Sequence, residues 1–397
     1  MQGAILAMIA AVALSASACD EHSNSGQPGS PDPDPGDGAD ATANVQFPDP
    51  DWPAGDAGDR GFDVAGLDAA ASYAEQYESR CLLVIQDGEI VYERYFHGDD
   101  ETTLNKTWSI AKSFSSALIG AAIQRGEIAG VDQPVASHVP QWSGTPREDI
   151  TLRHLLSMTS GLEHDLVSDN TWTILSANNT DDAVQTELES EPGSVWHYSN
   201  HAVQVLDAVL EHATGLDPED YARQVLWQPI GMGPDTRWER DRAGNTTMYM
   251  SVYATCRDLA RLGYLYLHGG QWAGTPIIDP DHVAASVQAS QGLNRGYGYL
   301  WWVNAGEPAF DATGDQFDGT IVPGAPAELF SAQGLGQSFI DVIPSERTLY
   351  VHVRPAPHEP LSQFITDPSG TMQKILDDGH RTLHRELMKR LLDASPK

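Results

Sequence analysis

The 397-residue sequence contains little cysteine and little positive charge. Its three cysteines include no Cys-x-x-Cys pair, which excludes zinc ribbons, thioredoxin-like redox centres and disulfide-dense scaffolds. Because 23 Lys and Arg oppose 56 Asp and Glu, the formal net charge is −33. A field of this sign repels phosphate backbones, so no nucleic-acid partner is expected. The acidic surplus itself is typical of a soluble or salt-tolerant surface.

Two widespread catalytic motifs are also missing from the chain. Without Gly-x-Ser-x-Gly, a nucleophile of the α/β-hydrolase kind is unsupported, and no His-Glu-x-x-His zinc motif occurs among the 14 histidines. We therefore expect no metal and no other cofactor.

The first 18 residues form an apolar run of small side chains that ends directly before Cys19. This run is shorter than the roughly 20 residues that a helix needs to span a bilayer, and it is typical of an export signal with a small-residue cleavage site. It resembles a bacterial lipoprotein signal, which would place a lipid on Cys19; an ordinary signal peptide is the alternative. We expect an exported protein on the periplasmic or outer side of the cell envelope, touching the membrane through its lipid anchor only.

Residues 19–58 are the expected linker. Pro, Gly, Asp and Ser dominate this segment, which therefore cannot bury enough apolar surface to offset its ordering entropy and stays extended. The folded part is expected over residues 59–397. In an oxidising compartment its two cysteines, Cys81 and Cys256, either form a disulfide or remain two buried thiols.

The apolar pattern of the folded part predicts a helix, a hairpin with an Asp87-Gly88 turn, a helix-rich middle, late strands and a terminal helix. Helices are expected at residues 62–80, 109–125, 152–159, 200–214, 217–225, 257–268 and 372–392, and strands at 81–86, 89–96, 297–303, 328–331, 338–343 and 348–354. Two early and four late strands can share one sheet only if the middle is an insertion.

We therefore predict an α/β (α+β) fold in which helices flank an antiparallel sheet. The sheet subdomain covers about residues 59–125 and 256–397, and an inserted all-helical subdomain covers about 126–255. A cleft between the two parts is the natural place for a functional site.

Ser109 and Lys112 are the main candidates for chemistry. On a helix, residues three apart share a face, and a serine at the first turn also meets free backbone N–H groups that can stabilise an oxyanion. Lys112 is the one charged side chain between residues 107 and 124. An apolar environment lowers the pKa of an amine, so this lysine could activate the serine hydroxyl. The alternative is a capping serine with a solvent-exposed lysine.

Tyr198 and Asn200 form a second candidate group, two residues apart at the start of a predicted helix. A phenol at this place can pass a proton to a leaving group. Asn200 can hydrogen-bond an acyl amide or hold Lys112. The structural alternative is a helix entry with Ser199 or Asn200 as the N-cap.

These motifs resemble the β-lactamase-related serine hydrolases, a family that includes class C β-lactamases, D,D-peptidases, esterases and 6-aminohexanoate-oligomer hydrolases. The likeness runs from about residue 83 to 353 and includes Ser109-Ile-Ala-Lys112, the stretch 150–161, Pro192-Gly193 and Tyr198-Ser-Asn200. It implies a β-lactamase/transpeptidase-like fold. It also implies that Ser109 is the acyl-forming nucleophile, Lys112 its activator and Tyr198 the general acid and base.

The third family motif is different in this chain. Where β-lactamases and D,D-peptidases carry Lys-Thr-Gly or His-Thr-Gly on an edge strand, residues 329–337 contain neither Lys nor His. Gly334 still permits close approach of a substrate, and the N–H of Leu335 could complete an oxyanion hole. The missing cation favours a neutral ester or amide substrate, on the esterase and aminohexanoate-hydrolase side of the family. A β-lactamase or D,D-peptidase and a non-catalytic envelope sensor remain the alternatives, and the sequence does not predict the oligomeric state.

Overall fold

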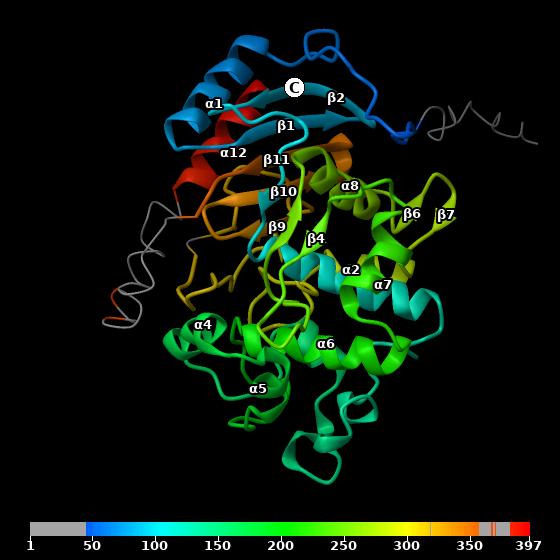
Figure 1. Cartoon of the computed structure of the whole chain (residues 1–397). Coiled ribbons are helices and arrows are strands. Elements are labelled where there is room, and N and C mark those ends of the chain that lie inside the picture. Colours follow the sequence, from blue (N-terminus) through cyan, green and yellow to red (C-terminus); the bar gives the residue numbers. More distant parts are fainter. Residues whose placement is uncertain (1–44, 318, 357–366, 368–369, 371–381) are drawn as a thin grey trace, which may run out of the picture. The chain divides into compact units, whose positions relative to one another are not determined.

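Six antiparallel strands form the central sheet, in the order β2-β1-β11-β10-β9-β8. The computed structural model describes residues 45–317, 319–356, 367, 370 and 382–397. The sheet strands are β1 (Cys81–Gln86), β2 (Glu89–Tyr95), β8 (Trp302–Val303), β9 (Phe330–Gly334), β10 (Ser338–Ile343) and β11 (Thr348–Val353). Two early and four late strands therefore share one sheet, which confirms the predicted antiparallel sheet with an insertion between its halves (Figure 1).

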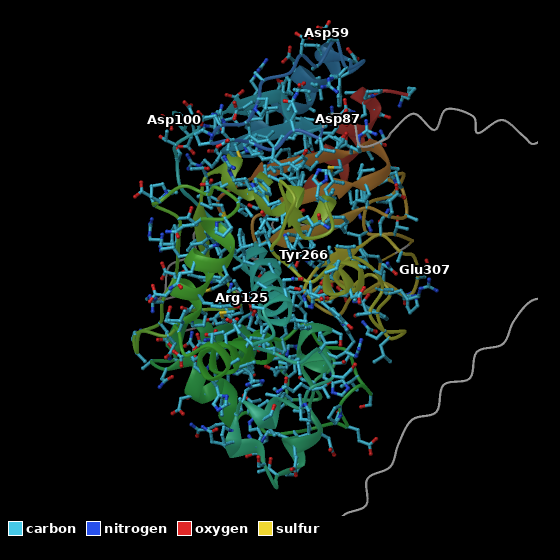
Figure 2. All side chains as sticks on the ribbon, turned by 90° about the vertical axis from the view of Figure 1, so that its right-hand side faces the viewer. Asp59, Asp87, Asp100, Arg125, Tyr266 and Glu307 are labelled. Atoms are coloured by element: carbon cyan, nitrogen blue, oxygen red, sulfur yellow. A yellow bond between two sulfur atoms is a disulfide. The ribbon has the colours of Figure 1, made fainter. Side chains whose placement is uncertain are left out.

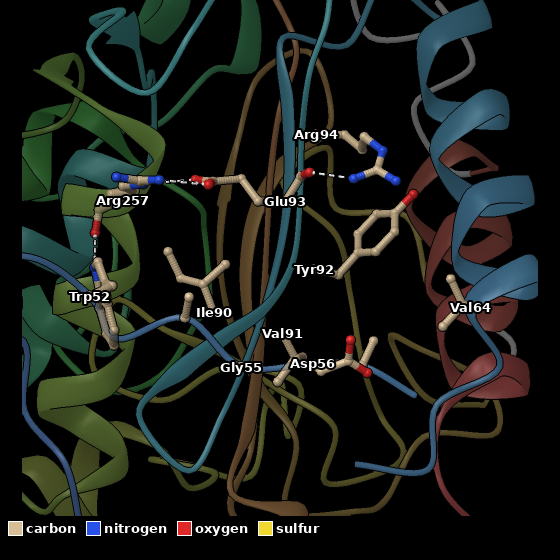
Figure 3. A pocket seen from close by; sticks show the side chains of 12 residues that line it. Trp52, Gly55, Asp56, Val64, Ile90, Val91, Tyr92, Glu93, Arg94 and Arg257 are labelled. Carbon is tan, nitrogen blue, oxygen red and sulfur yellow. Dashed lines mark hydrogen bonds and ion pairs between the residues drawn. The ribbon is translucent and has the colours of Figure 1, made fainter. Parts of the chain in front are cut away.

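Helices cover both faces of this sheet, as two neighbouring residues of β2 show. Adjacent side chains of a strand point to opposite faces. The Tyr92 hydroxyl donates to Asp68 of α1 (Val64–Gln76) at 2.8 Å, whereas Glu93 pairs with Arg257 of α8 (Cys256–Leu267) at 2.7 Å. Figure 3 shows the same strand edge-on, with α8 on one side and Val64 of α1 on the other. Burial on both faces explains why β1 begins with five successive apolar residues and why all six residues of β10 are buried.

The remaining elements lie mostly in the inserted region between α2 and α8. The helices are α2 (Ile110–Gln124), α3 (Leu152–Leu156), α4 (Leu166–Leu175), α5 (Asn179–Gln185), α6 (Asn200–Thr214), α7 (Pro218–Ala222), α9 (Pro280–Ser286) and α12 (Leu383–Ala394), with single turns at Val135–Ser137, Pro140–Trp142, Pro146–Asp149, Arg223–Trp227 and Pro344–Glu346. Short strands β3 (Asn105–Lys106), β5 (Val252–Ala254) and β4 (Arg237–Trp238) form a second sheet, and β6 (Gln271–Trp272) pairs with β7 (Thr275–Pro276). The inserted region is thus mainly helical but also contains β4 and β5.

A disulfide joins the first residue of β1 to the first residue of α8. Cys81 and Cys256 are bonded across 175 residues of sequence, with their Cα atoms 6.6 Å apart. Of the two states that the sequence allowed for these cysteines, the structure has the disulfide rather than two free thiols. It links the sheet directly to the helix that packs on it.

The folded part begins before the expected boundary at residue 58. Trp52 is buried, and its indole N–H donates to the carbonyl of Arg257 at 3.1 Å. The N–H of Gly55 donates to the carbonyl of Ile90 at 2.9 Å, so this segment extends the edge of β2. The prediction that residues 45–58 belong to the linker is therefore wrong. Aromatic and apolar side chains of this segment pack against the folded unit. The expected export signal, Cys19 and the linker up to residue 44 lie outside the described residues.

Some of the acidic side chains lie on the outside of the folded unit. Asp59, Asp100 and Glu307 are exposed, whereas Tyr266 lies buried in the core (Figure 2). Within residues 45–317, 319–356 and 382–397, no helix has both the length and the apolar character that a membrane crossing requires.

Several expected elements have other bounds in the structure; the strand expected at 328–331, for example, is β9 (Phe330–Gly334). The strand predicted at 297–303 is wrong for its first five residues, because the chain turns at Leu300, where φ is +58°, and the N–H of Leu300 donates to the carbonyl of Leu156. The terminal helix predicted at 372–392 is described only from Leu383 onward, as α12, and its earlier residues lie outside the described part of the chain.

Candidate active site

A tight turn presents Ser109 at the start of α2. Trp108, the residue before it, has a left-handed backbone with φ of +50°, which L residues rarely adopt. The N–H of Ser251 donates to the Trp108 carbonyl at 2.8 Å, and the N–H of Thr107 donates to the Val252 carbonyl at 3.1 Å, so the small sheet holds this turn. Ser109 is half-buried, and its hydroxyl does not cap the helix. The capping alternative for Ser109 is therefore wrong.

Lys112 lies one turn further along α2 and is almost completely buried, with 1% of its surface exposed. Its Nζ lies 3.1 Å from Ser109 Oγ, 2.7 Å from Asn200 Oδ1 and 2.9 Å from the carbonyl oxygen of Tyr249. Three oxygen partners fit the three directions in which an ammonium or amine nitrogen can form hydrogen bonds. The expected proximity of Ser109, Lys112 and Asn200 is present, and the alternative of a solvent-exposed lysine is wrong.

Burial also changes the acidity of this amine. Removal from water disfavours the ammonium form and lowers the pKa of Lys112 from 10.5 to about 7, although the negative charge of Asp169 acts in the opposite direction. A substantial fraction of Lys112 is then neutral near pH 7 and able to accept a proton from the hydroxyl beside it.

Tyr198 completes the group around Ser109 and Lys112. Lys112 Nζ lies 4.6 Å from the centre of the Tyr198 ring, and Ser109 is near enough to the phenol to lower its pKa. Trp302 stacks on the Tyr198 ring, with the two ring centres 5.6 Å apart. Burial raises the pKa of Tyr198, and the influence of Ser109 opposes only part of this effect. The resting phenol therefore keeps its proton and can act as an acid.

Asn200 is free to contact Lys112 because its neighbour caps the helix. The Ser199 hydroxyl accepts the N–H of Ala202 at 3.2 Å and is the N-cap of α6. Asn200 is the first residue of the helix and turns its amide oxygen to Lys112. Of the two N-cap candidates, the structure selects Ser199.

The open half of β9 faces the start of α2. Strand β8 pairs only with Phe330 and Ser331 among the described residues, so Gly334 lies beyond its end. The Cβ position of Gly334 points to the carbonyl oxygen of Thr107, two residues before the serine. Leu335 follows in the turn to β10, and its contribution to an oxyanion hole stays a prediction. No cationic side chain occurs along β9.

The profile of the family described as Beta-lactamase matches residues 68–351, which is most of the chain. The chain belongs to the beta-lactamase family. This match confirms the resemblance that the Ser-x-x-Lys and Tyr-x-Asn motifs indicate. In the structure the two motifs meet at Lys112, which contacts both Ser109 and Asn200.

Individual relatives include enzymes with different names. A 6-aminohexanoate-dimer hydrolase of Paenarthrobacter ureafaciens is 24% identical over 259 residues, which is 60% of this chain and 64% of that protein. Esterase EstB of Burkholderia gladioli is 29% identical over 176 residues, which is 38% of this chain and 44% of the esterase. The matched part is thus less than two thirds of either relative. A penicillin-binding protein of Bacillus halodurans has a TM-score of 0.56 at 15% identity, covers 77% of this chain and 98% of its own, and shows the same fold.

Two residues that contact Lys112 or Asn200, namely Tyr249 and Asp169, were not identified from the sequence. Tyr249 contributes a backbone carbonyl, which side-chain identity cannot reveal. Asp169 lies on α4, a helix that the sequence analysis did not predict; the helix-capping residue Asp165 before Leu166 was the available signal. In the described part of the chain, no cluster of three or more His, Cys, Asp or Glu side chains could hold a metal ion.

A separate hollow of about 350 Å³ lies along the edge of β2, and none of the candidate residues lines it. Trp52, Glu93 and Arg257 form one wall and Val64 lies opposite (Figure 3). Arg257 is held by Glu93 at 2.7 Å, and Arg94 pairs with Asp68 at 3.0 Å. Both arginines that line this hollow are therefore already paired with carboxylates.

Proposed function

We propose that this family member is a serine hydrolase that forms an acyl-enzyme on Ser109 from a neutral ester or amide. The observation that carries the proposal is the buried Lys112 amine, 3.1 Å from the Ser109 hydroxyl and with a pKa of about 7. A serine hydroxyl is a weak nucleophile alone and needs such a base.

The proposed acylation moves one proton from the serine to the leaving group. Ser109 Oγ attacks the carbonyl carbon while its proton passes to Lys112, and backbone N–H groups of Ser109 and Leu335 stabilise the oxyanion. The bond to the leaving oxygen or nitrogen then breaks as Tyr198 gives that atom a proton, and Lys112 returns a proton to Tyr198. In deacylation, water attacks the acyl carbon, and its proton returns through the same groups to Ser109 Oγ.

The charge of the site supports a neutral substrate. A carboxylate-bearing β-lactam or peptide terminus would find no Lys or His on β9, and the net charge of −33 disfavours anions generally. The names of two relatives, an esterase and a 6-aminohexanoate-dimer hydrolase, agree with hydrolysis of an ester or an amide bond.

The proposal is tested with a p-nitrophenyl ester of a short acid and a fluorophosphonate probe. The purified protein should hydrolyse the ester, and the intact mass should show one adduct on Ser109. Ser109→Ala should lose both signals with an unchanged circular dichroism spectrum, whereas Ser143→Ala, an exposed serine of the inserted region, should keep both. Undiminished turnover by Ser109→Ala overturns the assignment. Fast nitrocefin turnover would instead favour a β-lactamase, and no labelling or turnover with any ester, amide or β-lactam would favour a binding protein.

We also propose that the protein is an exported lipoprotein anchored through Cys19. The disulfide between Cys81 and Cys256 supports an oxidising compartment, since such bonds are rare in the cytosol. Expression of the full chain in a bacterium should give a membrane-associated protein whose N-terminal peptide begins with a diacylated Cys19. Cys19→Ala should release it from the membrane fraction, and an unlipidated wild-type N-terminus would contradict the proposal.

A further inference from the structure

Asp169 is a buried carboxylate that joins α4 to the first turn of α6. It has 2% of its surface exposed. Its Oδ2 accepts the N–H of Asn200 at 2.9 Å, and its Oδ1 accepts the N–H of His201 at 3.1 Å and lies 2.6 Å from His201 Nδ1. These two N–H groups belong to the start of a helix, where backbone donors lack partners within the helix and a negative charge is favourable.

The same residue, Asn200, contacts both Asp169 and Lys112. Its N–H is held by the carboxylate while its Oδ1 lies 2.7 Å from Lys112 Nζ. A displacement of the first turn of α6 would therefore move the amide oxygen away from the amine. Trp172 of α4 stacks on the His201 ring with centres 4.0 Å apart, which adds a second contact between the two helices.

Asp169 also carries its charge close enough to act on the amine. Burial by itself raises the pKa of Asp169, but the hydrogen bonds from His201 and Asn200 outweigh it, so this pKa is lowered and the group is a carboxylate. Its attraction is the one charge effect that opposes the desolvation of Lys112. The other titratable groups that face this pair are Tyr198 and Tyr249 beside Lys112, and His164 and His201 beside Asp169.

We propose that Asp169 is a positioning residue of the acyl-transfer centre, which holds the first turn of α6 so that Asn200 stays against Lys112. Its negative charge favours the protonated amine and so raises the pH at which Lys112 becomes a base. This inference rests on the proposed function, because it assumes that Lys112 serves Ser109. It assigns a role to a residue that touches neither the nucleophile nor the substrate carbonyl.

The test is the pH dependence of fluorophosphonate labelling of Ser109, measured from pH 5 to 9 with the intact protein. Asp169→Asn removes the charge and should shift the midpoint of the acidic limb down by about one pH unit, the size expected for loss of a nearby opposite charge. Asp169→Glu keeps the charge but displaces it by one methylene, so it should keep the midpoint and lower the plateau rate about tenfold or more. Asp165→Asn removes an exposed carboxylate at the start of the same helix and should change neither value.

A purely structural role would lower the melting temperature without moving the midpoint. An Asp169→Asn profile that coincides with the wild type in both midpoint and plateau overturns the inference. If Asp169→Asn does not fold, as judged by circular dichroism, Asp169→Glu decides: a wild-type plateau rate contradicts the positioning role. Absence of Ser109 labelling in the wild type would overturn the proposed function together with this inference, so the two failures are distinguishable.

Discussion

Gly334 of β9 and Thr107, two residues before the candidate nucleophile, approach so closely that no side chain fits between them. A Cβ atom at Gly334 would lie less than 3 Å from the carbonyl oxygen of Thr107 and would also touch Ile110. Real Cβ atoms do not come so close to a backbone oxygen. The distance between the open half of β9 and the start of α2 therefore depends on glycine at this position.

Gly334→Ala should damage the site more than the fold. The added methyl group must push β9 away from Thr107, which moves the adjacent Leu335 relative to Ser109. We expect ester turnover to fall at least about 100-fold, as for misplacement of a catalytic group by about 1 Å. Gly292→Ala is the matched control, because its Cβ would enter open space. Turnover and labelling are measured for both variants, and equal activity would show that the contact relaxes without cost.

The proposed base predicts the pH profile of hydrolysis. Only the neutral amine of Lys112 can accept the serine proton, and its pKa is about 7. The value of kcat/KM for a neutral ester should therefore rise with pH and reach half of its plateau near pH 7. Lys112→Met has no base and should be inactive across the range. A wild-type profile that is flat from pH 5 to 9 would contradict this role of the amine.

The Cys81–Cys256 disulfide should contribute strongly to stability. It closes a loop of 175 residues, and a long loop loses much conformational entropy in the unfolded chain when it is cross-linked. Cys81→Ala combined with Cys256→Ala should lower the free energy of unfolding by about 2–5 kcal/mol. Denaturant titrations with and without reductant measure the effect. Reductant should destabilise the wild type but leave the double variant unchanged; an equal response would mean that the cross-link is not formed.

Asp207 on α6 predicts a loss of stability as pH rises. It is fully buried, and burial raises its pKa from 3.8 to about 8, with further contributions from Glu211, Asp217 and Asp241. Between these pH values the folded state binds more protons at Asp207 than the unfolded chain does, so its contribution to stability falls with increasing pH. Asp207→Asn should therefore gain stability relative to the wild type as pH is raised to 8.

The difference between wild type and Asp207→Asn, measured by urea titration at several pH values, isolates this group. Asp220→Asn, at an exposed position, is the control and should show a constant difference. A constant difference for Asp207→Asn as well would mean that its carboxyl is ionised in the folded state.

Local patterns in the sequence predicted much of the fold. The apolar run at Cys81 and the Asp87-Gly88 turn predict the β1–β2 hairpin, and the apolar stretch after Ser109 predicts α2; both are confirmed. Helices α4 and α5 were not predicted, because α5 is short and polar and the apolar residues of α4 lie at its two ends instead of along one face. The contact of Asp169 on α4 was missed as well, since its partner Asn200 lies 31 residues away.

For the candidate active site too, the contacts between residues close in the sequence could be predicted, whereas most contacts between distant residues could not. Ser109 and Lys112 are three residues apart on one helix, so helical geometry alone brings them together. Their contact with Asn200 spans 88 residues, and only the combination of two motifs indicated it. The carbonyl of Tyr249, 137 residues from Lys112, has no signature in the sequence, because every residue type carries the same backbone oxygen.

The bond between Cys81 and Cys256 places Ser109, Lys112, Asp169 and Tyr198 within one covalent ring. A protease that nicks any single peptide bond in this ring leaves two fragments that are still attached through sulfur. Such a nicked molecule would run as one species on a non-reducing gel and separate only after reduction. Wherever proteases are common and thiols are scarce, one cut would not be enough to separate the groups that surround the serine.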